Sequence, residues 1–455
     1  MHGKRELQHI DFGDARLTER LEKMLEDFAN NPSASIPEAC GSLAAAKAAY
    51  RFFSNDAVEA KKIRNGYCKA TIEKMVEQGE NVTFLFKADA TNIVFSSHKK
   101  LAGIGVLRNQ NARGLNLHTT LVSTENEVTL GIVDQYCWSR KPEDYGKRAE
   151  RSKKPIEEKE SFRWIESFRA SQKSLPSNAK GIFIADRGAD IYELFLEPRN
   201  QNMHILIRAL HNRALTDSSE KMFQDLEKTD CVGTVKVLIN RSGERKERTA
   251  ELEIRYKKIS INSPINKPGL SPISITLISA TEKLGAEKVQ DPIYWKLLTT
   301  LPIDSLDKAI YAITTYSKRW LIERYHYVLK QGCQVEELQL EEAERIDKAI
   351  AVYTIVACRI MHLTYLARTS PEAPCTNVFD DDEWRALYCY ANKTSEEPNE
   401  PMSLHQAVIM LAKIGGFLGR KRDGYPGVKV IWRGICKLEG ATEMYRILKE
   451  KTRCR

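Results

Sequence analysis

The sequence predicts a mixed α/β protein whose strand-containing centre is flanked by helical regions at both ends. Apolar residues recur at three-to-four spacing near both termini, which is typical of helices. Between residues 82 and 300, short apolar or alternating runs typical of strands predominate. A chain of 455 residues is long enough for about three domains.

The composition excludes several protein classes. Apolar residues make up 42% and charged residues 29%, which is ordinary for a globular protein and argues against a collagen, a coiled-coil rod or a disordered chain. No uninterrupted apolar run reaches the ~18 residues of a membrane span. The start, MHGKRELQHIDFGD, lacks the apolar segment of a secretory signal. We therefore expect a cytoplasmic protein without a membrane partner, in which the ten scattered cysteines are reduced.

The net charge of +9 is unevenly distributed. Residues 372–400 carry a net charge of −6 and predict an acidic linker, whereas residues 413–455 carry +8. A basic surface usually serves solubility, but it also fits a polyanionic partner such as nucleic acid.

Residues 1–75 are expected to be helical. Two stretches, 14–30 and 42–53, place apolar residues on one helical face. Arg20 and Arg51 lie on these helices and could bind DNA phosphates, although a solvated helix face explains them equally simply.

The strand pattern begins at Val82 and is expected to end at Asp89. The next predicted elements are a β-hairpin of strands 117–123 and 128–136, a mobile basic loop over 140–159, and a helix over 160–172. A short apolar strand, 182–185, then leads directly into Asp186, after which Gly188 and Asp190 are expected to open a helix. Acids that follow a strand in this way occupy the edge where α/β folds place their chemistry.

Residues 211–300 are expected to be mostly β-structure. The strands predicted in and before this region are 203–209, 233–239, 249–257, 273–280 and 293–300. After Pro302 the pattern becomes helical, with Asp304 as the expected N-cap and Gly332 as the expected end. Further helices are predicted at 341–367, 402–415 and 438–451.

The predicted helix 304–331 carries a polar stripe. At 100° per residue, Tyr316, Arg319, Glu323 and Lys330 fall within about 60° of one another. A salt-bridged surface helix would produce the same pattern. Together with Asp89 and Asp186, however, Glu323 would complete a set of three carboxylates from separate elements. Such a set suits Mg²⁺ or Mn²⁺, and two such ions can assist phosphodiester cleavage or transfer.

The segment YSKRWLIERYHYVLK has the spacing Y-x₂-R-x₃-E-x₆-K. It resembles the signature of the bacterial cut-and-paste DDE transposases of the IS-four superfamily, and most closely the Tn-five type. Other segments resemble the same family in the same order: FGDARLTERL, AAYRFFSN, KADATN, IADRGADIY, ILIRALHNR, YWKLLTT and KIGGFLGRKRDGYPG.

The resemblance implies an α/β catalytic core of ribonuclease-H-like fold with a β-rich insertion over about 211–300, flanked by all-α N-terminal and C-terminal domains. The implied boundaries are 1–70 for a DNA-end-binding domain, 71–369 for the catalytic domain and 370–455 for a dimerisation domain. The catalytic and metal-binding residues would be Asp89, Asp186 and Glu323, with two Mg²⁺ or Mn²⁺ ions in each site.

The resemblance further implies a transposase that binds terminal inverted repeats as a homodimer, at the nucleoid when bound to DNA. It would nick one strand, form and open a hairpin, and join the 3′-OH to target DNA. The implied DNA contacts are Tyr316, Arg319, Lys330, Arg208, Arg213, Arg187, Arg20, Arg51, Trp295, which would stack on a flipped base, and Trp138, which would wedge into the gap.

Two related functions remain as alternatives. A domesticated nuclease of the same fold would cleave DNA but not integrate it. A non-catalytic regulator is disfavoured because all three acids are present. One departure from the family pattern is Gly188, which stands where the D-R-E-A-D segment has a glutamate.

Overall fold

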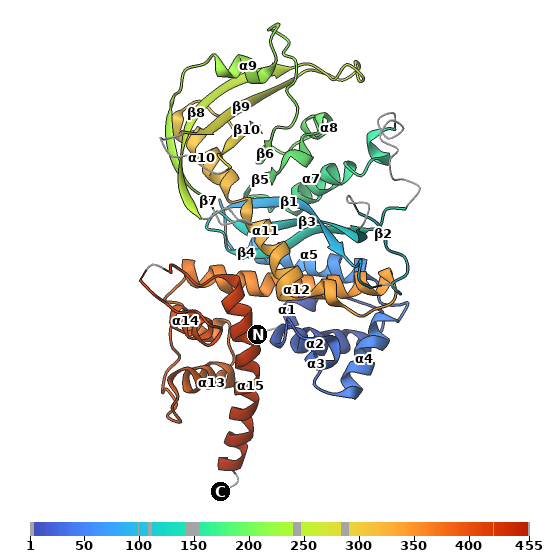
Figure 1. Ribbon diagram of the computed structural model, residues 1–455, viewed down its shortest axis with the longest axis vertical. Helices are drawn as coiled ribbons and strands as arrows, with labels where there is room; N and C mark the ends of the chain where they lie inside the picture. The colour runs from blue at the N-terminus through green and yellow to red at the C-terminus, as the bar shows by residue number, and fades with distance from the viewer. Residues whose placement is uncertain are drawn as a thin grey trace.

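The computed structural model describes residues 4–98, 100–107, 112–141, 154–239, 247–283, 291–421 and 423–453. Most of the loop predicted over 140–159 lies outside these residues. Figure 1 shows the arrangement: a central sheet, a β-rich region above it, and two helical groups below it formed by the two ends of the chain.

One ten-stranded sheet runs through the protein, in the order β2-β3-β1-β5-β6-β10-β9-β8-β7, with β4 paired to β3. The strands are β1 (Thr83–Val94), β2 (Gly105–Val106), β3 (Arg113–Thr124), β4 (Thr129–Trp138), β5 (Lys180–Ala185), β6 (Met203–Arg208), β7 (Gly233–Ile239), β8 (Arg248–Ile261), β9 (Ile273–Glu282) and β10 (Tyr294–Thr299). The β1–β5 and β5–β6 pairs are parallel, whereas the remaining pairs are antiparallel. The hairpin and all strands expected between 203 and 300 are confirmed.

The helices before and within the sheet region are α1 (Lys4–Leu7), α2 (Ala15–Asn30), α3 (Ile36–Ala39), α4 (Leu43–Phe53), α5 (Ala60–Val76), α7 (Phe162–Ser174), α8 (Tyr192–Leu196) and α9 (Met222–Glu227). Asp14 caps α2 by accepting a hydrogen bond from the Arg16 backbone N–H, which satisfies one of the free donors at a helix start. The apolar spacing therefore predicted the helical N-terminal region correctly.

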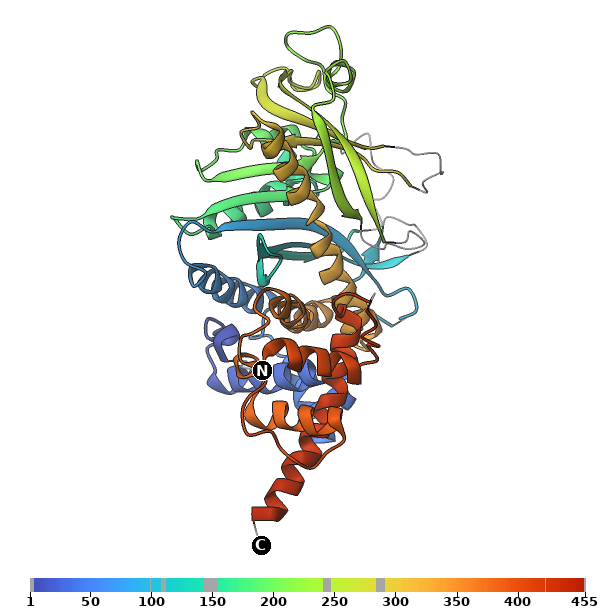
Figure 2. The same ribbon diagram turned by 90° about the vertical axis from the view of Figure 1, so that its left-hand side faces the viewer.

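The later helices are α10 (Leu306–Ser317), α11 (Trp320–Tyr327), α12 (Ala343–Thr369), α13 (Asp381–Asn392), α14 (Leu404–Ile414) and α15 (Val428–Arg453). Helix α12 lies between the sheet and the terminal helices (Figures 1 and 2). By length and composition it could span a membrane, but 83% of its most apolar window is buried inside the protein. Helix α12 is therefore a core helix of the protein.

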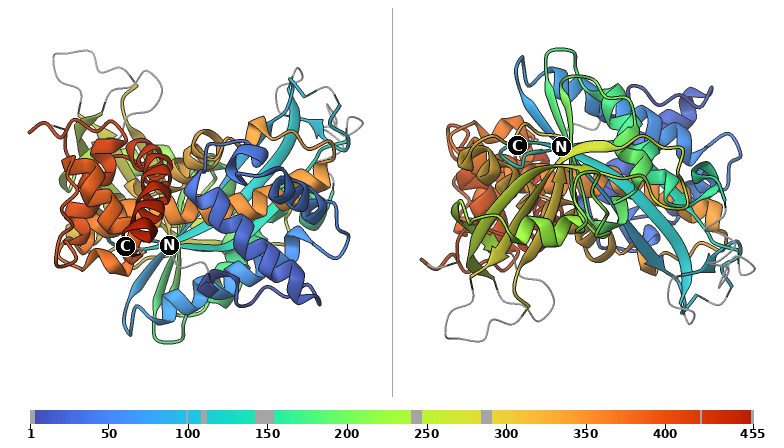
Figure 3. Two further views of the ribbon diagram at one scale, coloured as in Figure 1. Left: turned by 90° about the horizontal axis from the view of Figure 1, so that it is seen from below. Right: turned by 90° about the horizontal axis from the view of Figure 1, so that it is seen from above.

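The protein has apolar cores on both faces of the sheet. One core joins β1, β3 and β4 to α11, α12, α5 and the terminal helices. A second lies on the other side with α7 and α8, and a third packs α10 against the β7–β10 region. Seen from below, the N-terminal and C-terminal helices lie side by side under the sheet (Figure 3). The nine cysteines in the described part of the chain are all free.

Four sequence-based expectations about the elements are wrong. Strand β1 does not end at Asp89 but continues to Val94, because residues 90–94 pair with β3. The acidic linker contains α13, which begins with a capping box formed by Asp380 and Glu383. Helix α15 begins ten residues earlier than expected, at Val428. Asp190 opens no helix, because it is buried in an ion pair with Arg213 and α8 begins only at Tyr192.

The prediction of a single helix over 304–331 is also wrong. The segment forms α10, a break, α11 and then a π-helical turn, Val328–Gly332. At the break, the Ser317 hydroxyl donates to the Thr314 carbonyl, which competes with a regular helical bond. The N-cap is Ser305 rather than Asp304, since the Ser305 hydroxyl accepts from the Lys308 backbone N–H.

Candidate active site

Three acidic residues lie near the middle of the sheet. Asp89 lies within β1, Asp186 directly follows β5, and Glu323 lies in α11, which packs on β1. Strands β1 and β5 are parallel neighbours, and Ala88 is opposite Ala185, so Asp89 and Asp186 lie at the same level of the sheet. The topology thus brings the three predicted acids together from three separate elements.

Arg319 connects these acids. Its guanidinium donates to Asp89 Oδ2 at 3.3 Å and to Glu323 Oε1. Burial raises the pKa of Asp89 to about 7, an effect that Arg319 opposes and that the charges of Asp186 and Glu323 reinforce. Asp186 therefore belongs to the same electrostatic cluster, in which the guanidinium supplies positive charge to closely spaced carboxylates.

In the described part of the chain, no three acidic, His or Cys side chains are close enough to hold a metal ion as they stand. The oxygen donors of the acid cluster nevertheless match what Mg²⁺ and Mn²⁺ prefer. With Arg319 bonded to two of the acids, its guanidinium stands where an ion would be attracted.

Asp186 is held by its own turn. Its carboxylate accepts from the Gly188 backbone N–H at 2.8 Å, which caps the turn Arg187–Ala189. A Cβ atom on Gly188 would lie 2.9 Å from the Trp164 ring and 3.0 Å from Asp186 Oδ1. The ring of Trp164 and the Asp186 carboxylate therefore leave little space for a longer side chain at position 188.

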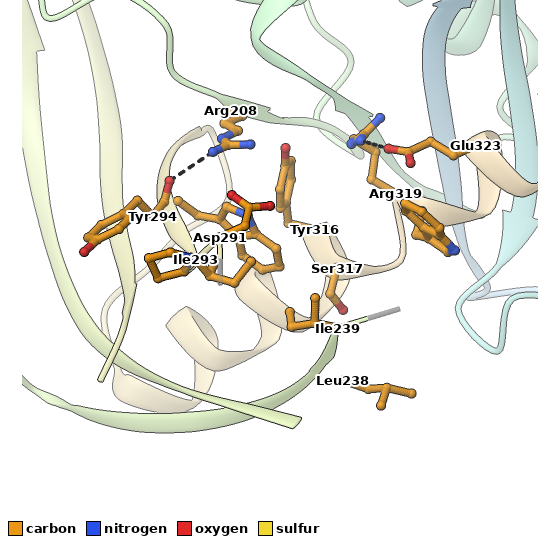
Figure 4. Close-up of a pocket in the computed structure, with 13 residues that line it drawn as sticks. Arg208, Leu238, Ile239, Asp291, Ile293, Tyr294, Tyr316, Ser317, Arg319 and Glu323 are labelled. Carbon is orange, nitrogen blue, oxygen red and sulfur yellow. Dashed lines mark hydrogen bonds and ion pairs between the residues drawn. The ribbon is translucent and has the colours of Figure 1, made fainter. Parts of the chain in front are cut away.

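A cavity of about 250 Å³ opens beside Arg319 and Glu323 (Figure 4). Arg208, Trp295, Tyr316, Arg319 and Glu323 are among its lining residues. The ring of Trp295 meets that of Tyr316 edge-on, with centroids 5.1 Å apart. Trp295 is only partly buried, whereas Tyr316 is 4% exposed, and its burial raises the pKa of its hydroxyl.

The cations around this cavity differ in their environments. Arg208 donates to the Tyr294 carbonyl, and burial lowers its pKa, with the positive charges of Arg187 and Arg319 adding to the effect. Arg187 is exposed beside Asp186. Arg208 and Arg187 thus form a positively charged side of the site.

The other predicted DNA contacts bond to residues outside the acid cluster or lie on the N-terminal helices. Lys330 is in the π-helical turn, 3.6 Å from Glu336, so the regular helix expected from the sequence does not extend to it. Arg213 is buried in its ion pair with Asp190. Trp138 lies at the end of β4, with its indole N–H directed to Glu160. Arg20 is partly buried on α2, and Arg51 is exposed on α4.

Sequence reasoning missed the lining residues that come from the β-rich region and the start of α11. They include Asp291, Tyr294 and Trp320. Asp291 has a positive φ of 57°, which is uncommon for a residue other than glycine. The sequence does not indicate that Asp291 lines a cavity, because the cavity forms only where β10 approaches α10 in the folded protein.

Three family models match the chain in consecutive order. Transposase DNA-binding matches residues 3–58, Transposase DDE domain matches 162–359, and Transposase Tn5 dimerisation domain matches 355–451. Asp186 and Glu323 fall inside the DDE match, whereas Asp89 precedes it. These three matches cover most of the chain in the order DNA binding, catalysis and dimerisation. The chain therefore belongs to the Tn5-like DDE transposases of the IS-four group, which are DNA-binding enzymes that cleave DNA and transfer its strands.

Proposed function

We propose that this transposase excises an insertion sequence at its terminal inverted repeats and joins the 3′-OH ends to target DNA, with Asp89, Asp186 and Glu323 as the catalytic acids. The observation that carries the proposal is the acid cluster around Arg319, which draws on β1, the end of β5 and α11. Holding like charges together in a partly buried site destabilises the folded protein, so we expect such a cluster to serve a function.

The strand order supports a ribonuclease-H-like core. Strands β4-β3-β1 are antiparallel neighbours, and β5 and β6 continue from β1 in parallel. Strands β7 to β10 would then be the insertion, added at the β6 edge. We propose the domains 1–70, 71–369 and 370–455, with α5 crossing the first boundary as a continuous helix.

The acids would bind two Mg²⁺ or Mn²⁺ ions. Bound ions would activate the attacking oxygen and stabilise the leaving oxygen of each phosphodiester. The chain's own groups would position the DNA: once released from Asp89 and Glu323, Arg319 could bind a phosphate, together with Arg208 and Arg187. Tyr316, Lys330, Arg213, Trp138, Arg20 and Arg51 remain proposed DNA contacts.

The cavity next to the acids suits a flipped base in a hairpin mechanism. Its volume of about 250 Å³ can hold a nucleobase, and Trp295 offers a partly exposed ring at its wall. Stacking on an aromatic ring is worth roughly 1–3 kcal/mol per base, which would help to offset the bending of the DNA end.

Replacing Trp295 with alanine tests this mechanism. The first nick needs no flipped base, so Trp295→Ala should slow hairpin formation by roughly ten- to a hundred-fold, the kinetic equivalent of the stacking energy, and slow nicking far less. Purified protein, DNA with the element's ends and Mg²⁺ would be sampled over time on denaturing gels. Trp295→Phe is the comparison variant, because it keeps an aromatic ring at the cavity wall and should largely preserve stacking. Equal slowing of both steps in Trp295→Ala would support a structural role for this tryptophan.

A domesticated nuclease of the same fold is the second candidate. It would give nicked and hairpin products in the same reaction but no joining to target DNA. Inverted repeats flanking the gene, together with strand-transfer products, would identify the transposase. We further propose that it acts in the cytoplasm and that residues 370–455 form its homodimer contact. The dimerisation-domain match to residues 355–451 supports the homodimer.

A further inference from the structure

A mostly buried polar cluster lies on the same face of the sheet as Asp89. It comprises Arg64 from α5, Thr119 from β3, Gln135 from β4, Tyr325 from α11, and Asp347 and Thr354 from α12. We name it the Gln135 cluster. Buried polar groups are costly unless they are satisfied, so a fully bonded cluster of this kind fixes the elements that contribute to it.

The sheet register links this cluster to Asp89. Asp89 in β1 is directly opposite Thr119 in β3, and Thr119 is directly opposite Gln135 in β4. Side chains of opposite residues point to the same face of a sheet. Asp89, Thr119 and Gln135 therefore form one row across three strands, and Gln135 Nε2 lies 3.1 Å from the Thr119 hydroxyl.

The Gln135 cluster also contacts α11, the helix that carries Glu323. Tyr325 follows Glu323 by two residues in α11 and is fully buried. Its hydroxyl lies 3.0 Å from Gln135 Nε2 and 3.1 Å from Thr354 Oγ1. Helix α11 has eight residues and no side-chain N-cap. Its rotation about its axis thus depends on packing and on the polar contacts of Tyr325.

Arg64 determines how the Gln135 amide is oriented. Arg64 Nε donates to Gln135 Oε1 at 2.9 Å, and its guanidinium is paired with Asp347. Because arginine can only donate, the amide oxygen must face Arg64 and the amide N–H groups must face the hydroxyls. Of the three hydroxyls near Gln135 Nε2, that of Thr354 can itself donate to Gln135 Oε1, at 3.2 Å. This explains how an amide with two N–H groups satisfies three neighbours.

We propose that Tyr325 and Gln135 are positioning residues that set Glu323 of α11 against Asp89 of β1. The inference rests on the proposed role of Asp89 and Glu323 as metal ligands. Neither Tyr325 nor Gln135 touches the acids; they act through the helix and the strand row that carry them.

The test compares Tyr325→Phe with the matched control Tyr353→Phe. Both tyrosines are fully buried in the same core, but the Tyr353 hydroxyl has no hydrogen-bond partner among the described residues. Each change removes one buried hydroxyl and leaves the ring in place. Thr354→Val is a second variant, which breaks the same contact from the side of α12.

The readout is Mn²⁺ binding to the complex of protein with terminal-repeat DNA, measured by electron paramagnetic resonance. Removing a group that orients a metal ligand typically costs 10- to 100-fold in metal affinity, so Tyr325→Phe should weaken Mn²⁺ binding by about ten-fold. DNA affinity should stay within about two-fold of wild type, since no phosphate contact changes. Nicking by Tyr325→Phe should recover at saturating Mn²⁺, and Thr354→Val should behave in the same way.

Tyr353→Phe should bind Mn²⁺ like wild type. Wild-type Mn²⁺ affinity in Tyr325→Phe would overturn the inference, as would an equal loss in both phenylalanine variants. A lower melting temperature with unchanged Mn²⁺ affinity would assign Tyr325 a structural role only and would overturn it too. Glu323→Gln tests the proposed metal ligand separately from the positioning residues. Wild-type Mn²⁺ binding in that variant would show that Glu323 is not a ligand.

Discussion

At the scale of single residues, the acid cluster is organised by one arginine. Arg319 bonds Asp89 and Glu323, and these acids together with Tyr316 raise its pKa far above the ordinary range despite burial. A charge held so firmly is a competitor for any other cation at the same carboxylates. Metal binding and release of Arg319 would then be coupled, which would free the guanidinium for a DNA phosphate only when the ion is present.

This coupling predicts that Arg319→Ala binds metal more tightly than wild type. Without DNA, its Mn²⁺ affinity measured by calorimetry should increase several-fold, while DNA cleavage should fall because a phosphate contact is lost. Arg169→Ala is the control, because Arg169 pairs with Glu197 and not with an acid of the cluster. Unchanged or weaker Mn²⁺ binding in Arg319→Ala would show that the arginine does not compete with the ion.

At the scale of elements, sequence patterns predicted most helices and strands but not where they are interrupted. The apolar spacing of residues 304–331 is continuous, yet Ser317 and Arg319 make contacts that divide the segment into α10 and α11. The contact from Arg319 to Asp89 joins residues 230 positions apart, and no local pattern contains it. The sequence predicted Asp89, Asp186 and Glu323 as a set of acids, and the structure brings them into one electrostatic cluster. The cavity wall at Asp291 and the Gln135 cluster were not predicted, because they form through contacts between elements distant in the sequence.

The corrected start of α10 gives a stability prediction. Ser305 caps the helix, so Ser305→Ala should lower the free energy of unfolding by about 1 kcal/mol. Asp304 is exposed and pairs with Lys308 on the surface, where such pairs contribute little, so Asp304→Ala should destabilise the protein clearly less than Ser305→Ala. Denaturant unfolding monitored by circular dichroism would measure both. A larger loss in Asp304→Ala would restore Asp304 as the cap.

At the scale of the whole molecule, buried histidines should make the fold sensitive to acid. Burial and the nearby charge of Arg163 lower the pKa of His118 to about 3. The His118 ring is hydrogen-bonded to Ser167 of α7, and the Ser167 hydroxyl also donates to Asp134. The unfolded chain would take up a proton at this histidine near pH 6.5, whereas the folded protein would not do so until about pH 3.

The unfolded state therefore binds more protons between these values, and stability must fall as the pH falls. His118 alone should contribute a slope of about 1.4 kcal/mol per pH unit. In His118→Asn, the fall in melting temperature between pH 7 and pH 4.5 should be smaller than in wild type. Raised carboxyl pKa values, such as that of Asp89, act in the opposite direction, so the difference between the two proteins is the relevant quantity. An identical fall in both proteins would contradict the assignment.

We propose that Asp89, Asp186 and Glu323 form one metal-dependent site that cleaves DNA. The most direct measurement is nicking of terminal-repeat DNA in Mg²⁺ by wild type and by Asp89→Asn, Asp186→Asn and Glu323→Gln, with DNA binding measured in parallel. Each substitution should abolish nicking while binding persists, because each removes a ligand charge without removing a DNA contact. Nicking that persisted in any one of the three variants would show that the substituted acid is not a catalytic ligand.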